Sequence, residues 1–120
     1  MRARVARYGK PAPLLGFCID WLDRHVPDYD GPTVLVQGDT GPGNFMYADG
    51  AVTAVVDWEL AHFGDPMDDI AWLSLRTVQD TFTVFPDRLA EYEKLSGHRI
   101  DERRVWYYRL FAVTRLASIS

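Results

Sequence analysis

The sequence has 120 residues, of which 48% are hydrophobic and 13% aromatic, and its formal net charge is −4 at pH 7. A chain of this length and composition can build one globular domain with a core, but not a second domain. No apolar run approaches the roughly 18 residues that span a bilayer. The negative charge argues against a nucleic-acid partner, because phosphate backbones attract basic surfaces.

The single cysteine, Cys18, excludes a disulfide within the chain and a cysteine-rich metal site. The basic N-terminal segment lacks the apolar core of a secretory signal. From these features we expect a soluble, cytoplasmic protein that acts on small molecules and has neither a membrane nor a nucleic acid as partner.

The first predicted elements lead into a loop that is rich in glycine. Apolar residues recur at three- and four-residue spacings over residues 14–25, which predicts an amphipathic helix that Pro27 ends. Residues 33–36 (TVLV) predict a short, buried strand. The next eight residues, 37–44 (QGDTGPGN), contain three glycines and one proline. So many breakers between two apolar strands predict a loop that a rigid scaffold holds.

A β-hairpin is predicted next. Residues 45–48 and 52–56 have the composition of strands, and Asp49 and Gly50 between them suit a tight turn because glycine accepts a positive φ. The second of these strands ends on acidic residues. The hairpin therefore brings acids back beside the glycine-rich loop.

The remaining elements are predicted to be helical. Gly64-Asp65-Pro66 is typical of a helix start, and further acids in the first turn favour the positive helix end. Two more helices are predicted over residues 85–95 and 102–118, the second of them capped by Asp101. Three tryptophans on helix faces are predicted to lie in the core: Trp21, Trp72 and Trp106.

Asp39, Asn44 and Asp57 are the residues most suited to chemistry, because each sits at the edge of a predicted strand and the hairpin brings them together. Carboxylate and amide oxygens are hard ligands that suit Mg²⁺, whereas nothing indicates zinc. A carboxylate five residues before an asparagine also matches the spacing in phosphoryl-transfer sites, where the aspartate receives the hydroxyl proton and the asparagine binds metal. For Asp39 and Asn44 alone, the alternative is that they simply form turns.

Three ordered motifs carry a resemblance to a known family: QGDTGPGN at 37–44, VVDWE at 55–59 and GDPMDDIA at 64–71. Together they resemble the aminoglycoside phosphotransferase and choline kinase superfamily, whose fold is protein-kinase-like. The motifs look most similar to phosphotransferases related to the kinase-like domain fused to some acyl-CoA dehydrogenases. The resemblance runs from about residue 21 to residue 72.

The resemblance implies that Asp39 is the catalytic aspartate and that Asn44 and Asp57 are magnesium ligands. By the same resemblance, Asp65 and Asp69 are scaffold acids that tie the following helix to the loop. One departure is Gln37, which stands where the family pattern has histidine. Glutamine still donates and accepts hydrogen bonds, but it cannot become cationic.

Other interpretations of the same residues remain open. The glycines at 38, 41 and 43 do not make a Walker-type nucleotide loop, because no lysine follows and no helix begins there. The acids at 65, 68 and 69 either attract a cationic substrate or complement the helix dipole. His62 is a candidate for a supporting role near the site.

The expected fold class is α+β, namely part of a protein-kinase-like C-terminal lobe, mainly helical, with a short β-hairpin that carries the catalytic loop and the metal aspartate. We expect residues 1–120 to form this lobe portion, with the ATP-gripping N-terminal lobe absent, because neither Lys10 nor Lys94 follows a glycine-rich hairpin. A longer chain or a partner chain would supply that lobe.

The expected function is Mg²⁺-dependent phosphoryl transfer from ATP to a hydroxyl of a small molecule, with this chain inactive by itself. The alternatives are a non-catalytic kinase-like binding module and a metal-dependent hydrolase that uses the same acids.

Overall fold

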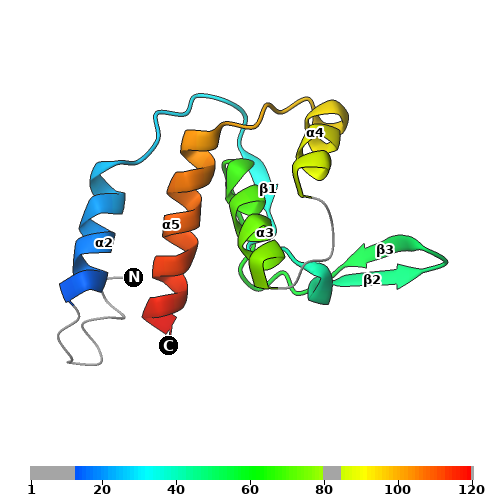
Figure 1. Cartoon of the computed structure of the whole chain (residues 1–120), viewed down its shortest axis with the longest axis horizontal. Coiled ribbons are helices and arrows are strands. Elements are labelled where there is room, and N and C mark those ends of the chain that lie inside the picture. Colours follow the sequence, from blue (N-terminus) through cyan, green and yellow to red (C-terminus); the bar gives the residue numbers. More distant parts are fainter. Residues whose placement is uncertain (1–12, 80–84, 120) are drawn as a thin grey trace.

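A computed structural model describes residues 13–79 and 85–119. Its elements in chain order are α2 (Pro13–Arg24), β1 (Val34–Val36), the 3₁₀ turn η1 (Pro42–Asn44), β2 (Phe45–Ala48), β3 (Ala51–Val55), β4 (His62–Gly64), α3 (Met67–Gln79), α4 (Phe85–Ser96) and α5 (Glu102–Ile119). Figure 1 shows α5 between α2 and α3, with the β2–β3 hairpin projecting at the end of the molecule away from α2. Within these residues the fold is a small α+β domain of four helices and two short strand pairs.

The hairpin forms as predicted. Strands β2 and β3 are antiparallel, with Phe45 opposite Val55, and the turn places Asp49 at φ 52° and Gly50 at φ 77°. Two successive positive φ values are what the tightest hairpin turns require, and Asp followed by Gly adopts them at low cost. The turn therefore confirms that the chain reverses here and returns beside the glycine-rich loop.

Strand β4 was not predicted. It pairs antiparallel with β1, with Val34 opposite Gly64 and Val36 opposite His62. The glycine-rich loop leaves the end of β1 that lies opposite His62, at the start of β4, whereas α3 begins after the other end of β4. The strand pair therefore supports the start of the loop, and Asp69 in the first turn of α3 connects that helix to the backbone of Gln37 and Gly38.

The core lies where α3 meets α5 and α4. Its buried residues are Met67, Ile70, Ala71 and Val105, and the partly buried side chains packed against them are Phe85, Leu89, Tyr92, Ile100 and Tyr108. Burial, together with nearby Asp65, raises the pKa of Tyr108 to about 12. The predicted cap is confirmed, since the backbone N–H of Arg104 donates to Oδ1 of Asp101 at 3.1 Å.

The predicted core tryptophans differ in burial. Trp72 is 5% exposed, as expected, but Trp106 is 65% exposed, so that prediction is wrong. Its neighbour Val105 takes the inward position on α5, and successive helix residues point about 100° apart. Trp106 instead lies beneath the guanidinium of Arg109, whose Cζ is 4.8 Å from the ring centroid.

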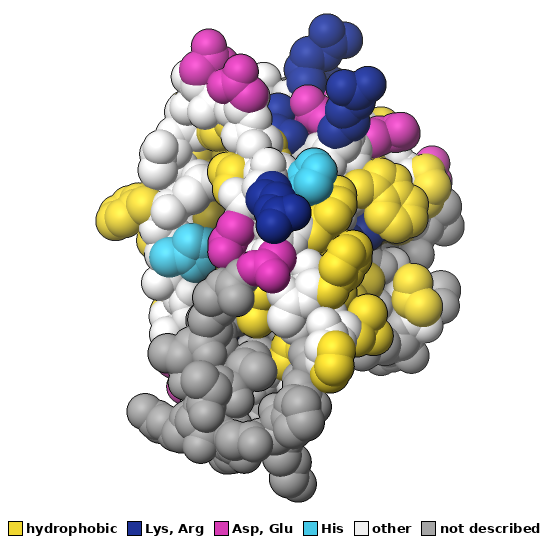
Figure 2. Space-filling model, turned by 90° about the vertical axis from the view of Figure 1, so that its left-hand side faces the viewer, with side chains coloured by type: hydrophobic (Ala, Val, Ile, Leu, Met, Phe, Trp, Pro, Cys, Tyr) yellow, Lys and Arg dark blue, Asp and Glu magenta, His cyan; other side chains and the backbone are white. Residues whose placement is uncertain are grey.

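Helix α2 packs on α5 with part of its apolar surface. Ile19 and Leu22 are buried, and the Tyr107 hydroxyl donates to the Leu22 carbonyl at 2.9 Å, whereas Leu14 and Phe17 are exposed. Figure 2, viewed from the α2 side, shows hydrophobic side chains gathered beside charged ones on this face. In the part of the chain that the structure describes, no helix combines the length and the apolar character needed to cross a membrane.

Candidate catalytic site

The glycine-rich segment 37–44 follows β1 and ends in η1, and it is called the catalytic loop after the role expected of it from the sequence. Gly38 has a φ of 90°, and a Cβ at this position would lie 2.5 Å from the carbonyl oxygen of Leu60. Both the positive φ and the close backbone approach therefore require glycine. The loop is thus pressed directly against the segment that follows β3.

Asp69 anchors the catalytic loop to the first turn of α3. Its carboxylate accepts hydrogen bonds from the backbone N–H of Gln37 at 2.8 Å, the backbone N–H of Gly38 at 3.0 Å and the hydroxyl of Thr40 at 2.6 Å. These bonds confirm the expectation that Asp69 ties the helix to the loop. A carboxylate with three donors fixes the loop far more firmly than a solvated acid would.

The two neighbouring acids also bind parts of the protein itself. Asp65 accepts from the backbone N–H of Met67 at 2.8 Å and pairs with Nε of Arg104 at 2.8 Å. It is therefore a scaffold acid, as expected, but it caps α3 and ties that helix to α5, whereas Asp69 makes the contact with the loop. Asp68 lies 2.9 Å from Nε2 of His62. Burial raises the pKa of Asp68, and the bond to His62 opposes that rise. These contacts favour the scaffold interpretation of the acids over a role in attracting a cationic substrate.

The Asp39 side chain points toward α3. Its Oδ1 accepts from Nη2 of Arg76 at 2.7 Å and from Nε1 of Trp72 at 3.1 Å. The side chain is 22% exposed, so part of the carboxylate remains open to a substrate. A partly exposed carboxylate in a fixed orientation suits a group that receives a proton from a bound hydroxyl.

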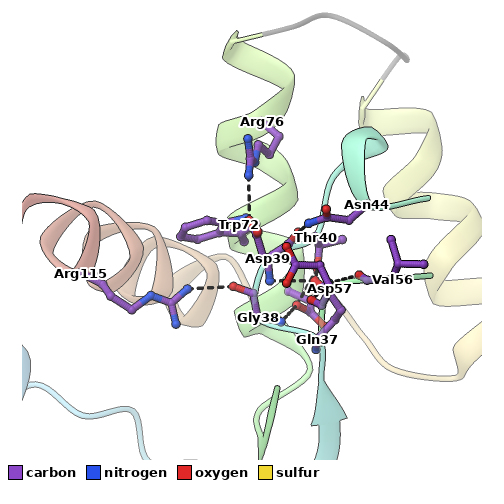
Figure 3. A network of polar contacts seen from close by, with 11 residues as sticks. Gln37, Gly38, Asp39, Thr40, Asn44, Val56, Asp57, Trp72, Arg76 and Arg115 are labelled. Carbon is purple, nitrogen blue, oxygen red and sulfur yellow. Dashed lines mark hydrogen bonds and ion pairs between the residues drawn. The ribbon is translucent and has the colours of Figure 1, made fainter. Parts of the chain in front are cut away.

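The structure brings Asn44 and Asp57 to the same place as Asp39, as predicted from the hairpin. Nδ2 of Asn44 donates to the backbone carbonyl of Asp39 at 2.7 Å, and the backbone N–H of Val56 donates to the Asn44 carbonyl at 2.8 Å. Figure 3 shows the three site residues gathered beside α3. Asp57 itself is exposed and has a φ of 63°.

This donor set fits magnesium. Because Nδ2 of Asn44 is used by the loop, its Oδ1 is the atom left for a ligand, and the Asp57 carboxylate is exposed. In residues 13–79 and 85–119, no three His, Cys, Asp or Glu side chains form a group that could enclose a metal. Mg²⁺ typically binds only one or two protein oxygens, and phosphate oxygens and waters occupy its other octahedral positions. One carboxylate and one amide oxygen match that number of protein ligands.

Gln37 connects the catalytic loop to the segment that follows β3. Its side-chain Nε2 donates to the carbonyls of Val56 at 3.0 Å and Asp57 at 2.8 Å, while its Oε1 accepts from the backbone N–H of Asp39 at 2.7 Å. The residue is 5% exposed. The glutamine therefore bridges the backbone of the loop aspartate and the backbone of the hairpin aspartate with one buried amide.

A Gln37→Glu variant is expected to weaken this bridge while keeping its size. The carboxylate has no N–H to give, and it would face the carbonyls of Val56 and Asp57. Buried acceptors left without donors cost about 1–3 kcal/mol of stability, and the misplacement of Asp39 relative to Asp57 is expected to lower kcat. Urea unfolding and steady-state kinetics measure the two effects. Gln37→His, which keeps one donor, should lie between parent and Gln37→Glu; equal kcat in all three would contradict the bridging role.

Sequence reasoning missed the basic residues around Asp39. Arg76 reaches it from α3, and Nη2 of Arg115 in α5 donates to the Gly38 carbonyl at 2.9 Å. A signal for Arg76 was present, since Asp69, Trp72 and Arg76 follow the i, i+3, i+7 spacing of one helix face. That face of α3 lies against the catalytic loop. No comparable signal points to Arg115, which is far away in sequence.

A groove among the described residues lies away from these side chains. Its volume is about 1100 Å³, and it is lined by residues of α3, of α5 and of the end of α2 with the segment after it. None of the three site residues lines it. The candidate site is therefore identified by its polar geometry and not by the size of a cavity.

Comparison with known proteins agrees with the motifs. Residues 1–106 match the phosphotransferase enzyme family. The chain is 46% identical to acyl-CoA dehydrogenase family member 11 of Rattus norvegicus over 57 residues, which cover 46% of this chain and 7% of that protein. It is 29% identical to probable acyl-CoA dehydrogenase IBR3 of Arabidopsis thaliana over 137 aligned positions, which cover 92% of this chain and 17% of that protein.

The chain thus spans less than a fifth of the length of either relative. The family match, in contrast, covers well over half of the chain and confirms the resemblance that the three motifs carry. The chain belongs to the phosphotransferase enzyme family.

Proposed function

We propose that this chain is the C-terminal-lobe portion of an ATP-dependent phosphotransferase and that it carries the catalytic loop. The observation that supports this most is the position of Asn44. Its side chain donates a hydrogen bond to the backbone carbonyl of Asp39, and its own backbone carbonyl accepts a hydrogen bond from Val56, the residue before Asp57. These two bonds gather one proton acceptor and two oxygen ligands. Family membership supports ATP as the phosphoryl donor.

In the proposed reaction, the hydroxyl oxygen of a small molecule forms a bond to the γ-phosphorus of ATP while the bond from that phosphorus to the bridging oxygen breaks, so that ADP leaves. The hydroxyl proton passes to the Asp39 carboxylate and from there to solvent. Such transfers need little covalent help from the protein. The main contribution of Asp39 is then to orient the acceptor hydroxyl.

Asn44 Oδ1 and the Asp57 carboxylate would hold Mg²⁺, which when bound neutralises charge on the phosphate oxygens. We further propose that another part of a longer protein, or a partner chain, grips the ATP phosphates. Lys94 lies in α4, away from any glycine-rich hairpin, and Lys10 falls outside the described residues.

The test is ATP turnover by the natural full-length protein or complex that contains this chain, assayed with a panel of small-molecule alcohols. We expect ADP formation that requires both Mg²⁺ and an alcohol and that stops on addition of EDTA. Phosphate release to water without an alcohol would favour a metal-dependent hydrolase. Nucleotide binding without turnover at any magnesium concentration would favour a non-catalytic module and contradict the proposal.

A further inference from the structure

Arg76 and Trp72 both bind one oxygen of the proposed catalytic carboxylate. Nη2 of Arg76 lies 2.7 Å and Nε1 of Trp72 lies 3.1 Å from Oδ1 of Asp39. Among residues 13–79 and 85–119, no group donates a hydrogen bond to Oδ2. We infer that Arg76, together with Trp72, is a positioning residue that locks the Asp39 carboxylate and presents Oδ2 to the acceptor hydroxyl. This inference rests on the proposed function.

Two donors on one oxygen restrict the carboxylate more than one would. The terminal torsion of an aspartate side chain is broad when nothing holds it, so the two oxygens exchange places easily. Here, rotation of the Asp39 carboxylate would break a charge-assisted bond and an indole bond at once. The result is one defined oxygen for the proton, which is the orientation that phosphoryl transfer needs.

The Arg76 side chain passes close to the catalytic loop at Gly41. A Cβ on Gly41 would lie 3.4 Å from both Cγ and Nε of Arg76, so the arginine stem crosses directly over this glycine. The φ of Gly41 is 176°, an extended value that any residue adopts. Distances of 3.4 Å correspond to van der Waals contact, so the arginine stem lies against the loop at position 41.

The guanidinium also lies near the ring of Trp72, with Cζ 5.7 Å from its centroid. Figure 3 shows Arg76 and Trp72 approaching Asp39 from the same helix, α3. Asp39, Trp72 and Arg76 thus form one connected unit that joins the loop to the helix.

The location of Arg76 favours a role in the reaction over a role in stability. Its side chain is 41% exposed and borders a hollow of about 110 Å³ lined by Trp72, Leu75, Arg76 and Leu116. Ion pairs with this degree of exposure add little to the stability of a protein. Loss of Arg76 should therefore leave the fold intact and change how Asp39 is presented.

The test compares Arg76→Ala, Arg76→Lys and Trp72→Phe in the natural full-length protein or complex. Arg76→Ala is expected to lower kcat by about 10- to 100-fold, because misplacement of a reacting group by an ångström costs up to about this much. KM for ATP and the urea midpoint should stay at parental values. Lysine has the charge but lacks the planar fork of donors, so Arg76→Lys should recover only part of kcat. Trp72→Phe removes only the indole donor and should cause a smaller loss.

A rescue experiment separates positioning from structure. Guanidinium ions at non-denaturing concentrations should restore part of the kcat of Arg76→Ala and none of the kcat of Asp39→Asn. Arg88→Ala is the matched control, because Arg88 makes an exposed ion pair with Glu91 on α4, and it should keep parental kcat with no response to guanidinium.

Two failures are distinguishable. Parental kcat in Arg76→Ala, alongside an inactive Asp39→Asn variant, would overturn this inference and leave the proposed function standing. A parental protein without magnesium-dependent ATP turnover would overturn both.

Discussion

An Asp57→Asn variant is expected to turn over ATP about 10²–10³-fold more slowly than the parent, and Asp39→Asn is expected to lose a similar factor. The two losses have different causes. Asp57→Asn removes the charged metal ligand, so part of its activity should return at high magnesium concentration. Asp39→Asn removes the proton acceptor, so magnesium should not restore it. Steady-state kinetics over a magnesium titration measures both.

Asparagine is the right replacement at position 57 because this residue has a φ of 63°. Asn adopts positive φ more readily than most residues, whereas Ala would add backbone strain to the loss of the carboxylate. Asp49→Asn is the matched control, since Asp49 also has a positive φ, of 52°, but lies at the tip of the hairpin. Parental turnover in both site variants would contradict the proposed function.

Local sequence signals predicted most of the elements that hold this site. The Asp49-Gly50 turn, the Pro66 helix start and the Asp101 cap each depend on a few neighbouring residues, and each is present in the structure. Such features can be predicted from the sequence because turns and helix caps depend on interactions among only a few neighbouring residues. The gathering of Asp39, Asn44 and Asp57 followed from the hairpin alone.

What was missed depends on contacts between distant segments. Strand β4 has three residues, too few for an alternating pattern, and it exists through its pairing with β1. The contacts of Arg76 and Arg115 with the catalytic loop join residues 37 and 77 positions apart. Exposure of Trp106 likewise follows from which face of α5 meets α3. Tertiary packing determines these features, and contacts between distant segments cannot be predicted from the local pattern of a single sequence.

The bridging role of Gln37 lies between these cases. The sequence showed a polar residue capable of both donating and accepting at the start of the loop. Only the structure shows that the carbonyls of Val56 and Asp57 are its acceptors. Glutamine at this position therefore gives the loop a hydrogen-bonded support.

Asp65→Ala is expected to lower the free energy of unfolding by less than the ~3–5 kcal/mol that breaking a fully buried ion pair costs, because the partly buried guanidinium of Arg104 keeps its pair with Asp101 at 3.2 Å. The side chains of Asp65 and Arg104 are 2% and 18% exposed. The same substitution removes the acceptor for the backbone N–H of Met67 at the start of α3, a cap that contributes about 1 kcal/mol of the loss.

Three further variants separate the ion pair from the cap in urea unfolding at pH 7. Asp65→Asn keeps an acceptor for Met67 and should lose less than Asp65→Ala. Arg104→Met combined with Asp65→Ala should lose less than the sum of the single changes, because the unpaired charge is gone. Glu91→Ala, which breaks the exposed pair with Arg88, should change stability by less than about 1 kcal/mol. A loss for Asp65→Ala as small as that of Glu91→Ala would contradict a structural role for this pair. Because α3 also carries the Asp69 carboxylate that anchors the catalytic loop, any loosening at Asp65 should lower kcat as well as stability.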